Sequence, residues 1–332
     1  MQQIALGETG RQTTRLGFGC SSIMGALGRR DSLAMLEAAF DAGVRHFDVA
    51  PMYGYGEAEV CLGEFLERHR GQITVTTKYG IPPEPKQGMR SLARSMARPV
   101  LKLLPGMKKR LAGVAAKAAT AGREATPKCS FRPDEALASF ERSLRALRSE
   151  RIDVWLLHEA RAEDLQDDGL LELMERLRQQ GKLGDYGVGS GYGKIPALLA
   201  ERPAYCRVVQ HEWSVQDAEI PRQGSYRIHH RSLTENFRRL HHALTTQPAL
   251  CTEWSQETGR DLADAKELAA LMLKAALVMN PDSVILFSSK NPTHIAENVR
   301  VAGDAALEAP ARSLYALMQT EGAAMLQGGS PA

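Results

Sequence analysis

Short apolar runs alternate with segments of helical periodicity along most of this chain, and this alternation constrains the fold more than any other feature. Eight runs have the length and composition of strands, at residues 15–20, 46–50, 73–79, 152–158, 185–190, 207–213, 225–230 and 283–288. Helical spacing predominates between them, at residues 31–42, 57–67, 133–148, 170–180, 194–201, 234–244 and 262–279, and a last helix begins at Asn291-Pro292. Such alternation is typical of parallel βαβ units.

The length of 332 residues and the eight repeats together predict a (β/α)8 barrel, the TIM barrel, as a single domain over residues 1–332. The alternative is an open, doubly wound sheet. No G-x-G-x-x-G motif follows the first strand, which argues against the dinucleotide-binding form of that sheet. The closed barrel is therefore the preferred prediction.

A long basic insertion, residues 81 to about 131, follows the third strand. Glu84 and Glu124 are its only acidic residues, and residues 89–97 and 107–119 have helical composition. Three interpretations stay open: a lid or specificity loop over the catalytic rim, a basic surface for an anionic substrate, membrane or acidic partner, and a solvated insertion.

Four titratable residues lie at or just beyond the ends of three successive predicted strands. Asp48, Lys78 and His158 are near the strand ends, and Tyr53 lies in the loop after Asp48. In a parallel barrel these ends form the rim where catalytic groups gather. A tyrosine, with a pKa near 10 when free, becomes a better proton donor to a carbonyl when a neighbouring ammonium favours its phenolate. Each residue alone has a structural explanation, but together they predict a site for acid–base chemistry.

Four segments carry a family resemblance: residues 43–54 (GVRHFDVAPMYG), 77–78 (TK), 153–158 (DVWLLH) and 288–298 (SSKNPTHIAEN). In this order they resemble the aldo-keto reductase superfamily, over residues 1 to about 305. The resemblance implies a (β/α)8 barrel whose lower end is capped by an N-terminal hairpin. It also implies NADPH-dependent reduction of an aldehyde or ketone, or the reverse oxidation. Tyr53 would donate the proton, Lys78 would lower its pKa, Asp48 would hold Lys78, and His158 would orient the carbonyl.

The resemblance also implies NADP(H) as the cofactor, in preference to NAD(H). Asn291 and Pro292 suit the N-cap and first position of a helix, and a helix start binds anions. In the family this segment holds the adenosine 2′-phosphate and the adenine; a routine capped helix is the alternative. His294 stands where the family often has an arginine, which weakens the expected preference for NADP. The residues carried over are Ser288, Ser289, Lys290, His294, Glu297 and Asn298.

The expected nicotinamide site departs from the family pattern. Ser190 stands in place of the family's asparagine and Gly189 in place of its serine, whereas Gln210 is in its expected position. His230 falls where an aromatic residue stacks on the nicotinamide, and Trp213 is expected either to line the substrate pocket or to pack in the core. The family's Pro-Leu sequence and Gly-rich loop after the seventh strand are absent.

The composition bounds the other possibilities. A net charge of +3 gives no reason to expect nucleic acid as a partner, and no apolar run is long enough to span a bilayer. Five scattered cysteines without a C-x-x-C pair predict free thiols and no metal site, and the N-terminus lacks a signal-peptide pattern, so a cytoplasmic location is expected. The oligomeric state stays open. The competing functions are an NADPH-binding regulatory or sensor subunit with little turnover, and a lyase or isomerase without net redox chemistry.

Overall fold

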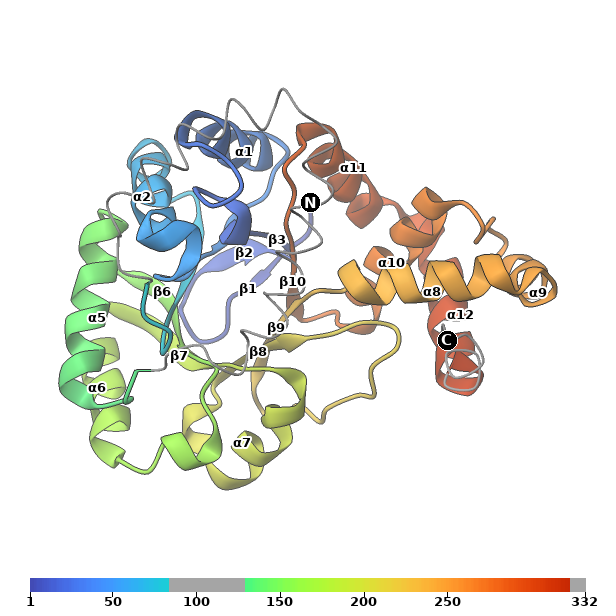
Figure 1. Cartoon of the computed structure of the whole chain (residues 1–332). Helices are drawn as coiled ribbons and strands as arrows, with labels where there is room; N and C mark the ends of the chain where they lie inside the picture. Colours follow the sequence, from blue (N-terminus) through green and yellow to red (C-terminus); the bar gives the residue numbers. More distant parts are fainter. Residues whose placement is uncertain (84–128, 323–332) are drawn as a thin grey trace, which may run out of the picture.

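The computed structural model describes residues 1–83 and 129–322, and most of the predicted basic insertion (84–128) lies outside them. Within the described residues, eight parallel strands close into a barrel in the order β10-β3-β4-β5-β6-β7-β8-β9. Figure 1 looks into this barrel. The prediction of a (β/α)8 barrel is confirmed. The strands are β3 (Leu16–Gly19), β4 (His46–Asp48), β5 (Thr74–Tyr79), β6 (Ile152–His158), β7 (Leu183–Gly189), β8 (Val208–Glu212), β9 (Tyr226–His230) and β10 (Ser283–Phe287).

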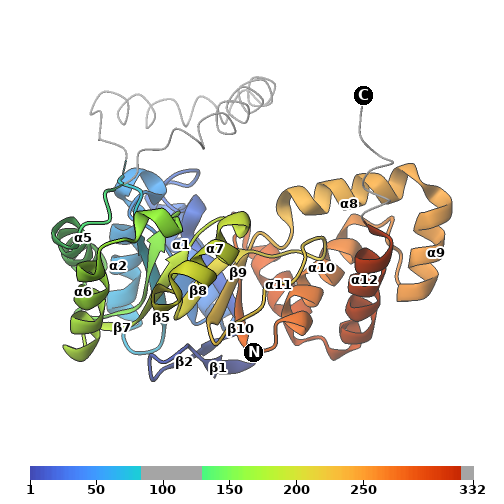
Figure 2. The same cartoon turned by 90° about the horizontal axis from the view of Figure 1, so that it is seen from below.

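An antiparallel hairpin of β1 (Gln3–Ala5) and β2 (Gln12–Thr14) precedes the barrel, as expected. Leu6 follows β1 and is fully buried among the inward-facing residues of the barrel, such as Val208 and Ile228. In Figure 2 the hairpin lies beneath the barrel. It therefore closes the end opposite to the rim formed by the carboxyl ends of the strands.

Helices surround the barrel and bury its outward-facing apolar residues against apolar residues of their own. Those of the barrel wall are α1 (Arg29–Asp41), α2 (Ala58–Arg68), α5 (Pro133–Ala146), α6 (Asp168–Gln179), α7 (Ile195–Glu201), α10 (Ala265–Met279) and α11 (Pro292–Gly303). Short 3₁₀ turns complete the connections: η1 (Cys20–Ser22), η2 (Tyr53–Gly56), η3 (Ala162–Asp164), η4 (Tyr192–Lys194), η5 (Pro203–Tyr205) and η6 (Ala305–Leu307).

Three more helices pack together beside the barrel: α8 (Thr234–Thr246), α9 (Pro248–Thr258) and α12 (Glu308–Thr320). Figures 1 and 2 show α8 and α9 extending away from the barrel, with α12 beneath α8. The sequence predicted α8 but neither α9 nor α12. Within the described residues, every helix is too short or too polar to cross a membrane.

Candidate active site

The loop after β4 places Tyr53 at the rim of the barrel. Gly54 follows with φ of +58°, and a Cβ at this position would lie 2.5 Å from the backbone oxygen of Ile23. Only glycine combines this positive φ with such a close backbone approach. The Gly54 turn therefore fixes where the phenol ring of Tyr53 lies.

Asp48 and Lys78 form a buried ion pair at the same rim. Lys78 Nζ donates to Asp48 Oδ1 at 2.6 Å and to the backbone oxygen of Val49 at 3.1 Å. The lysine is 1% and the aspartate 4% exposed. Burial opposes the charged form of Lys78, but Asp48 and Tyr53 outweigh it, so the pKa of Lys78 lies above its usual value. The ammonium is therefore retained although the side chain is shielded from solvent.

Lys78 also lies near Tyr53, with Nζ 5.4 Å from the centre of the phenol ring. Burial raises the pKa of Tyr53 above 10, while the Lys78 ammonium acts in the opposite direction. Lys78 thus lowers the pKa of Tyr53, as predicted. The prediction that this pKa falls overall is wrong, because desolvation of Tyr53 outweighs the effect of Lys78. Tyr53 is thus a neutral phenol that retains its proton.

His158, at the end of β6, faces Tyr53 edge to face, with ring centroids 6.4 Å apart and an interplanar angle of 87°. Desolvation, together with the positive charge of Lys78, holds the pKa of His158 well below 6.5. The imidazole is therefore neutral and can donate one N–H. The structure brings together all four residues predicted from the strand ends.

Gln210 adds a contact that the sequence did not predict. Its side-chain nitrogen donates to Asp48 Oδ2 at 2.7 Å, across the barrel from β8 to β4. Both oxygens of Asp48 therefore accept hydrogen bonds, one from Lys78 and one from Gln210. Gln210 is 2% exposed, so this bond is shielded from water.

The other residues expected around the nicotinamide lie on the same rim. Gly189 is the register partner of both His158 and Gln210. The next residue, Ser190, is buried and donates to the backbone oxygen of Ala160 at 2.8 Å. His230 is half-buried and ends β9. Burial lowers the pKa of His230, and the opposing effect of the Glu212 carboxylate is smaller.

The segment after β10 has the predicted capped helix. The Asn291 side chain accepts from the backbone N–H of Thr293 at 3.0 Å, and Pro292 opens α11. Ser288 donates to the backbone oxygen of Gly19 at 2.7 Å, whereas Ser289 is buried and donates to that of Asn291 at 3.0 Å. Four more residues of this segment were predicted to contact the cofactor. Lys290 and His294 are exposed, and Glu297 and Asn298 are half-buried.

Trp213 is 5% exposed and its ring stacks on that of Tyr315 of α12, with ring centroids 5.9 Å apart. This stacking favours a core role for Trp213 over a place in the substrate pocket.

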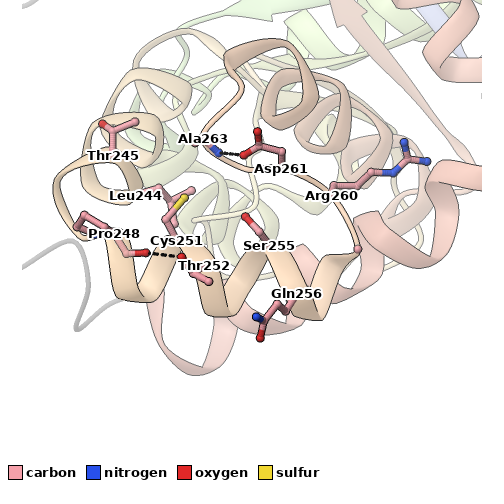
Figure 3. Close-up of a pocket in the computed structure, with 11 residues that line it drawn as sticks. Leu244, Thr245, Pro248, Cys251, Thr252, Ser255, Gln256, Arg260, Asp261 and Ala263 are labelled. Carbon is pink, nitrogen blue, oxygen red and sulfur yellow. Dashed lines mark hydrogen bonds between the residues drawn. The ribbon is translucent and has the colours of Figure 1, made fainter.

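A cavity of about 640 Å³ lies between α8, α9 and the loop that follows α9 (Figure 3). None of the predicted site residues lines this cavity, so it is not the candidate active site. Over the described parts of the chain, no group of three or more His, Cys, Asp or Glu residues is placed to hold a metal ion.

A sequence model described as the aldo/keto reductase family matches residues 15–309. Pyridoxal 4-dehydrogenase of Microbacterium luteolum is 44% identical over 79 residues, 23% of each chain. D-threo-aldose 1-dehydrogenase of a Pseudomonas species is 38% identical over 89 residues, 25% of this chain and 27% of that protein. The chain thus matches only about a quarter of the length of these relatives.

Solved structures show the same fold over almost the whole chain. An aldo-keto reductase from Bacillus halodurans, in its holo form, superimposes with a TM-score of 0.65 at 19% identity, covering 95% of this chain and 96% of that one. One from Klebsiella pneumoniae, in complex with NADPH, has a TM-score of 0.56 at 16% identity, covering 92% and 90%.

Proposed function

Because the chain belongs to the aldo/keto reductase family, we propose that it reduces an aldehyde or ketone to the alcohol with NADPH, or catalyses the reverse oxidation. One observation carries this proposal most directly. The buried Lys78–Asp48 pair, with its 2.6 Å hydrogen bond, lies beside Tyr53 and His158 at the carboxyl end of the barrel. These are the groups that protonation of a carbonyl oxygen requires.

The roles follow from the charge states of the four residues. Tyr53 holds its proton and donates it to the substrate oxygen, while the adjacent Lys78 ammonium stabilises the phenolate that this transfer leaves behind. Neutral His158 donates a hydrogen bond to the same oxygen and orients the carbonyl. Asp48 keeps Lys78 charged, and Gln210 keeps Asp48 in place. General acid assistance of this kind contributes about 10² to 10⁴ in rate.

NADPH, when bound, supplies the hydride, and the donor groups of the rim suit it. Exposed Lys290 offers a cation for the 2′-phosphate, and the start of α11 beside it offers backbone N–H groups. Half-buried Glu297 and Asn298 offer polar atoms for the adenine. Ser190, Gln210 and His230, which follow or belong to the neighbouring strands β7, β8 and β9, are the residues we assign to the carboxamide and the nicotinamide ring.

The first test compares Tyr53→Phe with Tyr55→Phe. Tyr55 is 42% exposed and two residues away, so it controls for removal of a nearby phenol hydroxyl. We expect Tyr53→Phe to abolish carbonyl-dependent NADPH oxidation without changing the Kd for NADPH, and Tyr55→Phe to retain turnover. Normal turnover in Tyr53→Phe would refute the proposed proton donor.

Cofactor preference is tested at Lys290. Lys290→Glu should raise the Kd for NADPH by about tenfold or more, since it replaces a charge-assisted contact with a repulsion, and should leave that for NADH nearly unchanged. Lys266→Glu changes an exposed lysine on α10 and serves as the control. Equal loss of NADPH and NADH affinity would contradict a 2′-phosphate contact.

A regulatory or sensor subunit is the second candidate. It is favoured by the altered nicotinamide surroundings, where Gly189 has no side chain and Gln210 is engaged by Asp48. Tight NADPH binding without oxidation by any member of a broad aldehyde and ketone panel would favour this candidate over the reductase.

A further inference from the structure

The outer face of β8 and β9 carries a buried basic cluster of Arg227, His229 and His211. Strand residues alternate between the two faces of a sheet. Tyr226 and Ile228 contact the barrel interior, so Arg227 and His229 point outward. His229 and His211 are register partners on neighbouring strands, and their rings meet edge to face with centroids 4.7 Å apart.

Arg227 is 1% exposed and has no carboxylate partner within the described residues. Its Nη2 donates to the backbone oxygen of Pro221 at 2.7 Å, but its Nη1 has no hydrogen-bond partner. Burial and nearby Arg222 lower the pKa of Arg227 to about 10, so the guanidinium is still charged at neutral pH. A buried charge of this kind requires a counter-ion or a full set of acceptors.

Cys206 does not supply the missing negative charge. It acts on Arg227 electrostatically, but burial raises the pKa of its thiol to about 12, and the thiol is neutral. Arg222 has a carboxylate nearby, that of Asp282 at 4.0 Å, but this aspartate is 82% exposed. The positive charge of Arg227 therefore stays uncompensated by the described side chains.

His229 presents a second unmet donor on the same face. It is 3% exposed, and neither of its ring nitrogens has a hydrogen-bond partner. Desolvation, with the adjacent basic groups, holds the pKa of His229 well below 6.5, so its neutral ring carries one N–H. His211 is already committed, because its Nδ1 lies 2.6 Å from the backbone oxygen of Glu212.

We propose that this face binds a small monovalent anion of the halide class, held between the Arg227 guanidinium and an N–H of His229. The two side chains leave the same face of one strand, two positions apart. They are also close enough for the charge of Arg227 to act on His229. A single permanent positive charge matches a monoanion, whereas phosphate or sulfate would leave excess negative charge buried.

Bromide tests this directly, because it replaces chloride and scatters X-rays anomalously. Crystals of the full chain grown or soaked in sodium bromide should show an anomalous peak between Arg227 and His229. In solution, replacing sodium gluconate by bromide at constant ionic strength should raise Tm by about 2 °C for each tenfold increase above the Kd. Arg238→Gln, which neutralises a surface arginine, should keep this response.

Arg227→Met should remove both the anomalous peak and the bromide response of Tm. If that variant does not fold, the wild-type crystal still decides. Absence of a bromide peak at Arg227 would overturn the proposal and assign ordered water to the orphaned nitrogens. A response of Tm that is unchanged in folded Arg227→Met would overturn it equally.

Discussion

Replacing Asp48 by asparagine tests how the rim keeps a charged lysine in the protein interior. The change preserves shape but leaves Lys78, 1% exposed, without its carboxylate. Removing one partner of a buried ion pair costs about 3–5 kcal/mol, since the other charge stays buried and unpaired. Because burial alone favours neutral lysine, Lys78 in Asp48→Asn should lose its proton well below its usual pKa.

The expected result is a fall of about 3 kcal/mol or more in the free energy of unfolding, measured with urea at pH 7. We also expect kcat to fall by about 10² to 10⁴, because Tyr53 loses its cationic neighbour. The double variant Asp48→Asn/Lys78→Met separates pairing from packing. It should lose less stability than the sum of the two single variants, since no charge stays unpaired. Strict additivity, or wild-type kcat in Asp48→Asn, would refute this reasoning.

Two further predictions concern neighbouring residues. Gly54→Ala should destabilise the chain by about 2 kcal/mol or more and lower kcat, since it adds a clash with Ile23 to the cost of a positive φ. The control is Gly259→Ala, at a φ of +63° with no atom close by, which should cost only about 1 kcal/mol. Equal losses of stability in the two variants, measured by urea unfolding, would contradict the clash. Burial lowers the pKa of His46 to about 4, so between pH 6.5 and 4 the unfolded chain binds a proton that the folded chain does not. The free energy of unfolding should therefore fall by about 3 kcal/mol from pH 6.5 to pH 4 through His46 alone. The free energy of unfolding of His46→Gln should depend correspondingly less on pH. Parallel pH profiles for the wild type and His46→Gln would exclude this role of His46.

The sequence predicted the barrel and the four rim residues because both depend on local pattern. Alternating apolar runs identify the strands, and Asp48, Lys78 and His158 at strand ends meet at one rim whatever the connecting loops do. Tyr53 lies in a loop, and the family resemblance identified it. Helix α9 was missed although Pro248 and Gly259 mark its ends, because its apolar residues do not recur at the spacing of one helical face. The net pKa of Tyr53 and the stacking of Trp213 on Tyr315 depend on three-dimensional packing, which no local pattern encodes.

The Gln210–Asp48 bond could not be predicted, since it joins residues 162 positions apart and depends on the stagger of the closed barrel. It need not displace Gln210 from the cofactor role that the family resemblance implies. Asp48 is a carboxylate and accepts only, so the amide nitrogen of Gln210 must face it, and the amide oxygen points elsewhere. That oxygen lies 3.4 Å from where a Cβ on Gly189 would be. With glycine at this position nothing from residue 189 covers the oxygen, which can accept a hydrogen bond from a carboxamide. The Gln210 amide can thus donate to Asp48 and accept from the cofactor at the same time. Gln210→Leu should therefore weaken NADPH binding and lower kcat together. Gln210→Glu should in addition place a second carboxylate beside Asp48, and the two would repel each other.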